Sequence, residues 1–164
     1  MFKRPVYKKT EQGFDIIENV FSLKERWIMK RQLCPLVKDL GKDYPGLQST
    51  ANLHEDIETK KLFNFYEKLF KVCNINNPKI SKSWINRADK FTISRFHNHI
   101  CDNITTTIVY YLTNPEKIGT IVDIDGEKIH YKSKENSILI LPSHIKHKAP
   151  RVNKTRYSVV VDLL

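Results

Sequence analysis

The chain has 164 residues, 40% of them hydrophobic, and a formal net charge of +10 at pH 7. This length fits one domain with one hydrophobic core, and the composition excludes a disordered or low-complexity chain. No apolar run reaches the roughly 20 residues that a membrane-spanning helix needs, and the basic N-terminus lacks the apolar stretch of a signal peptide. We therefore expect a single domain over residues 1–164, in a cytoplasmic protein with no membrane partner.

Cysteines and charge narrow the class of protein further. The three cysteines form no CxxC pair and are odd in number, which favours reduced thiols over a disulfide framework. Basic residues number 28 against 18 acidic ones, and the excess is mostly lysine spread over many segments. Such a charge attracts anionic partners, a nucleic acid or an acidic protein among them, but the spread of lysines does not identify one.

Two helices are expected first along the chain. From Ile17 to about Leu40, apolar residues recur at helical spacing until Pro35 ends or kinks the helix. The stretch from Gly41 to Asn52 carries turn residues, and His54 to Val72 then resumes the helical pattern. We expect these helices to form a support over residues 15–75.

Short β-rich runs follow after Pro78. They are separated by turn residues such as Asp125-Gly126, a hairpin signal. Seven short strands at regular spacing indicate a sandwich or small barrel. With two helices in front, they predict a mainly β jelly roll, with its core over residues 80–164, its convex sheet braced by the helices and its open end holding a site. The runs are Ile80 to Asn86, Phe91 to His99, Thr105 to Leu112, Ile118 to Ile124, Lys128 to Lys132, Ser137 to Leu141 and Thr155 to Leu163.

Three histidines are candidate metal ligands. His97 and His99 are one residue apart in a predicted strand, where side chains at i and i+2 point to the same face. His147 follows a buried strand that stops at Pro142. A single histidine that points inward is usually a hydrogen-bonded core residue, but two such histidines with a third after a later strand favour a metal site. Imidazole suits Fe, Zn, Cu and Ni, so residue type leaves the metal open.

The third ligand of such a site has two candidates. Fe(II) oxygenases use two histidines and one carboxylate on one octahedral face. Here the residue two positions after His97 is His99, where the carboxylate is usual. The chain therefore offers a three-histidine set, or a triad completed by Asp102 from the following turn. Asp102 also fits an ordinary turn residue.

Arg156 is a candidate anion-binding residue at the start of the last strand. It shares a face with Ser158 by strand alternation. An arginine on an otherwise apolar strand is expensive to bury unless an anion meets it, and its fork suits a carboxylate, to which the Ser158 hydroxyl can add a hydrogen bond. An edge-strand arginine that faces solvent or pairs with Asp162 fits the sequence equally well.

Five short motifs follow one another in the second half of the chain: Ser83-Trp84-Ile85-Asn86, His97-Asn98-His99, Val109-Tyr110-Tyr111-Leu112, Leu141-Pro142-Ser143 to His147, and Arg156-Tyr157-Ser158. Their order resembles the W-x-N, H-x-H-P, SGVYY, FPS-x-x-x-H and R-x-S series of the 2-oxoglutarate- and Fe(II)-dependent oxygenases common in marine bacteria and their phages. The resemblance spans about Ser83 to Leu163. The chain departs from the series at Ile100, at Thr107-Ile108 and at Leu141.

This resemblance implies a double-stranded β-helix, the cupin-like form of the jelly roll. It implies Fe(II) at His97, His147 and a third ligand, and its spacing favours His147 over His144. It also implies 2-oxoglutarate held through its distal carboxylate, with contacts from Arg156, Ser158, Asn86 and Tyr111.

The expected function is that of a hydroxylase that uses O₂ and 2-oxoglutarate to oxidise a substrate C–H bond. A peptide, a nucleobase and a small metabolite all fit as substrate. Two alternatives stay open: a cupin-like metalloprotein that uses three histidines without 2-oxoglutarate, and a non-catalytic jelly-roll module that binds an anionic partner through its lysines.

Overall fold

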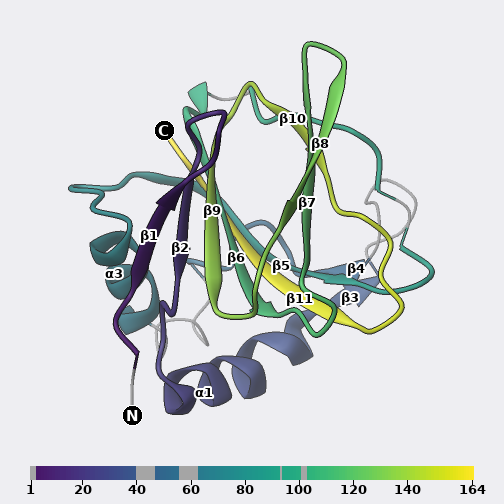
Figure 1. Cartoon of the computed structure of the whole chain (residues 1–164). Helices are drawn as coiled ribbons and strands as arrows, with labels where there is room; N and C mark the ends of the chain where they lie inside the picture. The colour runs from purple at the N-terminus through teal and green to yellow at the C-terminus, as the bar shows by residue number, and fades with distance from the viewer. Residues whose placement is uncertain (1–2, 40–46, 56–62, 93, 101–102) are drawn as a thin grey trace.

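Two antiparallel sheets and two helices make up the fold in the computed structural model, which describes residues 3–39, 47–55, 63–92, 94–100 and 103–164 (Figure 1). The larger sheet has the strand order β1-β2-β9-β6-β11-β5-β4-β3, and the smaller one has the order β10-β7-β8. The strands are β1 (Val6–Lys9), β2 (Asp15–Glu18), β3 (Lys38–Asp39), β4 (Leu47–Gln48), β5 (Ile80–Ala88), β6 (Thr106–Thr113), β7 (Ile118–Ile124), β8 (Glu127–Lys132), β9 (Ser137–Pro142), β10 (Lys146–Lys148) and β11 (Arg156–Leu163).

The first helix, α1 (Leu23–Leu33), begins at a capping box. The Ser22 side chain accepts a hydrogen bond from the Glu25 backbone, and the Glu25 carboxylate accepts one from the Ser22 backbone. A 3₁₀ turn, η1 (Cys34–Leu36), follows with proline inside it, as predicted for the helix end. The second helix is α3 (Phe63–Val72). Within the described residues, neither helix is long and apolar enough to cross a bilayer.

The predicted start of the first helix at Ile17 is wrong. Ile17 lies in β2, which pairs with β9 through Ile17 and Ile138. The Ile17 side chain is buried, so the strand places it in the core without a helix. The strands β1 and β2 form a hairpin at one side of the large sheet. Neither strand was predicted from the sequence.

Six of the seven predicted strands are present as β5, β6, β7, β8, β9 and β11, with ends that differ by at most two residues. The seventh, Phe91 to His99, is wrong as a continuous strand. Asp89 and Thr92 close a turn through side-chain hydrogen bonds, and Phe91 is exposed. In the described part of this segment, only His97 forms a bridge, to His147 of β10.

Two hydrophobic clusters lie on opposite faces of the large sheet. The outer cluster packs α1 and α3 against the sheet, with Phe21 and Phe65 against Tyr110. The inner cluster lies between the two sheets and joins residues such as Tyr111 and Val122. Alternation along β6 thus sends Tyr110 to the helices and Tyr111 to the interior. The helices brace one face, as predicted, and leave the space between the sheets for a site.

Candidate metal centre

The structure brings His97, His99 and His147 together. One ring nitrogen from each of them lies within 4.8 Å of the others, and the ring centroids are 4.7 to 5.2 Å apart. Two nitrogens on one ion lie about 3 to 4 Å apart, since each bond is about 2.1 Å; small ring rotations close the difference. No other group of three or more His, Cys, Asp or Glu side chains among the described residues has this spacing.

Backbone pairing fixes the cluster. His97 and His147 exchange both backbone hydrogen bonds, at 3.0 and 2.8 Å, and the His99 amide donates to the Ser143 carbonyl at 2.8 Å. The two histidine segments therefore form a short ladder that extends the small sheet beyond β10. Pro142 ends β9 just before this ladder, so the chain turns there and presents His147 to the interior, next to Val122 of β7.

Each of the three rings uses Nδ1 for a hydrogen bond to an oxygen. His97 Nδ1 lies 3.0 Å from the Arg95 carbonyl, and His147 Nδ1 lies 3.0 Å from the Ile145 carbonyl. A carbonyl only accepts, so both Nδ1 atoms carry the proton and both Nε2 atoms keep a lone pair. His99 Nδ1 lies 2.8 Å from both carboxylate oxygens of Asp162. Three Nε2 lone pairs are thus available to one cation.

The electrostatics keep the site ready to bind a cation. Burial, with smaller contributions from the neighbouring imidazoles, lowers the pKa of His147 to about 4 against the opposing bond to its backbone acceptor. Burial also lowers the pKa of His97. Both rings are therefore neutral at pH 7, the form that ligates metals. His99 and His147 are buried, whereas His97 is exposed, so the cluster opens to solvent on one side.

Asp162 was not among the residues expected to serve the metal site. It lies on the inner face of β11, 1% exposed, and accepts a 2.7 Å hydrogen bond from the Thr107 hydroxyl besides its contact with His99. The Trp84 ring stacks on the His99 ring, with the two ring centroids 5.7 Å apart. Alternation from Arg156 through Ser158 places Asp162 on the same face, so that pattern offered a signal for it.

Arg156 crosses the interior from β11 to β7. Its side chain is 3% exposed, and Nη1 donates to the carbonyls of Ile118 and Gly119 at 2.8 and 2.6 Å. The guanidinium lies 5.6 Å from the centroid of the Tyr111 ring. Solvent exposure and pairing with Asp162, the two alternatives for this arginine, are both wrong, because Arg156 is buried and Asp162 pairs with His99.

The Arg156 guanidinium pairs with no carboxylate of the residues that the structure describes. Its Nε is buried and has no hydrogen-bond acceptor among them. Burial lowers the pKa of Arg156 below its usual range. A buried cation of this kind is costly unless an anion meets it. Arg156 is therefore a candidate anion-binding residue on the inner wall.

Three further predicted contacts lie in one row across the inner face of the large sheet. Ser158 of β11 is opposite Asn86 of β5 on one side and Tyr111 of β6 on the other. Residues opposite one another in antiparallel strands point to the same face. Ser158 and Tyr111 are buried, and the Tyr111 hydroxyl bonds to Thr120 at 2.6 Å. The row is adjacent to Arg156.

Other candidates of the sequence lie elsewhere. Asp102, the alternative third ligand, lies outside the described residues. His144, the rival of His147, is exposed and is not part of the histidine group. His99 occupies the third position in the group that the structure does describe.

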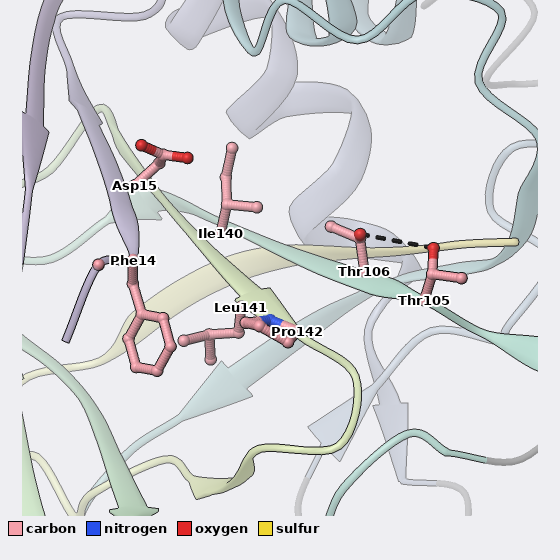
Figure 2. A pocket seen from close by; sticks show the side chains of 8 residues that line it. Phe14, Asp15, Thr105, Thr106, Ile140, Leu141 and Pro142 are labelled. Carbon is pink, nitrogen blue, oxygen red and sulfur yellow. Dashed lines mark hydrogen bonds between the residues drawn. The ribbon is translucent and has the colours of Figure 1, made fainter.

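A separate pocket lies at the C-terminal end of β9, lined by residues 13–15, 105–106 and 140–142 (Figure 2). Its volume is about 210 Å³. Its one acidic group, Asp15, pairs with Lys9, and Thr105 and Thr106 bond to each other. Apolar side chains such as Leu141 make up the remaining wall. The pocket holds none of the histidines and offers no cluster of ligands.

Sequence comparisons find no matching protein family and no matching curated protein, whereas solved structures match over nearly the whole chain. One is an oxidoreductase of the 2OG-Fe(II) oxygenase family from Burkholderia pseudomallei, with a TM-score of 0.73 and 13% identity over 93% of this chain and 84% of that one. A prolyl hydroxylase from Trichoplax adhaerens, in complex with a hypoxia inducible factor peptide fragment, has a TM-score of 0.70 and 11% identity over 94% and 84%. A non-heme alpha ketoglutarate dependent carbocyclase from nogalamycin biosynthesis has a TM-score of 0.72 and 10% identity over 98% and 87%. The chain therefore has the double-stranded β-helix fold of these oxygenases, as its sequence motifs imply.

Proposed function

We propose that this protein is an Fe(II)- and 2-oxoglutarate-dependent oxygenase that hydroxylates its substrate. The observation that carries the proposal is the presence of two features inside one fold: three histidines whose ring nitrogens converge, and a buried guanidinium that pairs with no carboxylate of the described residues. Either feature alone suits many proteins. Their combination matches a metal-bound dicarboxylate, because one end of such a ligand needs a cation with open positions and the other needs a bidentate donor.

The histidines fit a divalent transition metal. His97, His99 and His147 would hold Fe(II) through Nε2 and leave coordination positions open on the side away from the three rings. The neutral state of His97 and His147 at pH 7 favours metal binding by these two rings without a proton to displace. When bound, Fe(II) with 2-oxoglutarate and O₂ would supply the oxidising chemistry, and the chain would supply orientation and a dry wall.

The Arg156 region fits the distal carboxylate of 2-oxoglutarate. The two carbonyls that hold Nη1 orient the fork, the Tyr111 ring supports its face, and the buried Nε remains as a donor. Ser158 and Asn86 would add hydrogen bonds from the neighbouring positions. Val122, opposite His147, and Gly119, whose carbonyl accepts from Arg156, are three residues apart on β7, so the histidines and the arginine meet the same strand.

A peptide is the proposed class of substrate. One of the similar structures is a prolyl hydroxylase with a bound peptide fragment. Phe96 precedes His97 in the chain, and its ring lies 5.8 and 4.8 Å from the ammonium groups of Lys128 and Lys148. These cations favour acidic residues beside the target side chain. Oxidation of an oligonucleotide in preference to acidic peptides would replace this substrate class with nucleic acid.

The test of the proposed function is binding followed by turnover. Anaerobic calorimetry is expected to give one Fe(II) per chain and then one 2-oxoglutarate per Fe(II)-loaded chain, and aerobic incubation is expected to give succinate. H147A should lose Fe(II) binding and succinate formation, while H144A, which changes an exposed histidine outside the cluster, should keep both. Equal behaviour of the two variants would refute the assignment of His147.

The same experiment separates the leading function from the three-histidine alternative without 2-oxoglutarate. Tight Fe(II) binding by a chain that does not bind 2-oxoglutarate would make the protein a cupin-like metalloprotein with a structural Arg156. Binding of neither ligand would refute both metalloprotein functions.

A further inference from the structure

The least expected part of the site is a buried acid behind one histidine. Asp162 offers both carboxylate oxygens to His99 Nδ1 at 2.8 Å, and the buried Thr107 hydroxyl donates to Oδ1 at 2.7 Å. In the described part of the chain, its one ion-pair partner is His99. A carboxylate 1% exposed pays a large desolvation cost with so few partners, so a further source of positive charge near it would stabilise the folded chain.

We propose that Asp162 is a positioning residue that gives the metal site, through His99, the negative charge that other Fe(II) sites receive from a ligating carboxylate. This inference rests on the proposed function. Two histidines and a carboxylate leave a bound Fe(II) with a local charge of about +1, whereas three neutral imidazoles leave it at about +2. A carboxylate bonded to one of the three rings restores the lower charge without entering the coordination sphere.

The geometry distinguishes His99 from the other two rings. His97 and His147 donate Nδ1–H to neutral backbone carbonyls, whereas His99 donates to a charged acceptor. A charge-assisted bond polarises the imidazole and makes its Nε2 a better donor to a metal. The Trp84 ring, 5.7 Å away and 25° from parallel, holds the plane of the His99 ring. His99, at the position where a carboxylate is usual, is therefore the ring that is both held in its orientation and made a better electron donor.

The experiment measures metal affinity and ligand field with Co(II), whose visible absorption reports its coordination. D162N keeps the shape of the side chain and removes its charge; we expect Co(II) binding to weaken about 10- to 100-fold and the absorption bands to shift. D162E keeps the charge, and its affinity should recover at least in part. In an H99Q background, the further change D162N should alter the affinity less than about twofold, because the acid acts through that ring.

A purely structural role of Asp162 predicts different results. Wild-type affinity and absorption bands in folded D162N would overturn the inference, and so would an equal loss on adding D162N to H99Q. If D162N does not fold, T107V and T107S test the same bond: T107V should bind Co(II) about three- to tenfold more weakly than T107S, and equal affinities would overturn the inference. Failure of the wild-type chain to bind Co(II) or Fe(II) would instead refute the proposed function, and this inference with it.

Discussion

Replacement of Arg156 by methionine tests the anion site most directly. Methionine fills much of the buried volume of the arginine stem but offers no donor to a carboxylate. Nη1 already donates to the Ile118 and Gly119 carbonyls. A bound anion would therefore accept hydrogen bonds from the remaining donors, including Nε, which has no acceptor among the described residues. Loss of one partner of a buried charge pair costs about 2–5 kcal/mol, so the Kd of 2-oxoglutarate should rise about 30- to 4,000-fold.

The assay is calorimetry of the Co(II)-loaded protein with two ligands. Pyruvate has the same 2-oxo acid group as 2-oxoglutarate but no distal carboxylate. R156M should therefore strongly weaken the binding of 2-oxoglutarate and leave the weak binding of pyruvate unchanged. R151M, which removes an exposed arginine five positions earlier, is the matched control and should bind both ligands as the wild type does. Binding of 2-oxoglutarate by R156M within about threefold of the wild type would refute the placement of the distal carboxylate.

Three further predictions concern the frame around the site. A Cβ at Gly119 would lie 1.9 Å from a backbone carbonyl of the facing strand, so G119A should displace the carbonyls that hold the arginine and lower both the melting temperature and the affinity for 2-oxoglutarate; unchanged binding would contradict this reasoning. The Asn136 side chain bonds to both backbone groups of Phe21, at 2.9 and 2.8 Å. N136A should cost about 3 kcal/mol and lower Tm by about 6–12 °C, and a normal Tm would be the contrary result. Burial raises the pKa of Glu25, but hydrogen bonds from Lys68 and from the helix N-cap outweigh this effect and lower the pKa. The stability that Glu25 contributes is therefore full above its ordinary pKa and is lost as the pH falls through the lower folded value. The free energies of urea unfolding of the wild type and E25Q should converge at low pH, and a constant difference between them would exclude the effect.

Local patterns predicted most of the strands because period-two alternation and turn residues are properties of a few neighbouring residues. The first helix shows where such patterns fail. Ile17, Val20 and Phe21 have helical spacing, yet Ile17 belongs to a strand. Ile17 lies in a strand because it pairs with Ile138, more than a hundred residues later. The helix begins five residues beyond Ile17, at the capping box of Ser22. The pairing with Ile138 is not visible in a window of local sequence, whereas the Ser22-x-x-Glu25 capping box is a local signal that could have placed the helix start.

The candidate metal ligands were predictable where spacing alone brings them together. His97 and His99 are two positions apart, and the turn after β9 returns His147 beside them. The partners of these residues were not predictable in this way. Asp162 is 63 residues from His99, and the carbonyls that hold Arg156 belong to an irregular pairing of β7 with β8 around Gly119. Both partnerships depend on how the strands are placed across the interior.

One strand, β11, links the two ends of the site. Arg156 and Asp162 lie six residues apart on its inner face, so a register slip of one residue would turn both side chains toward the helices. The strand is hydrogen-bonded on both sides, to β5 and to β6, which makes such a slip costly. Its two irregularities in pairing fall between Tyr157 and Ser158 against β6, and between Asp162 and Leu163 against β5. In both cases the extra residue lies in the partner strand, Leu112 of β6 and Ser81 of β5, and β11 itself has no inserted residue. The alternation along β11 is therefore unbroken from Arg156 to Asp162, which keeps both side chains on the inner face while the neighbouring strands absorb the irregularities.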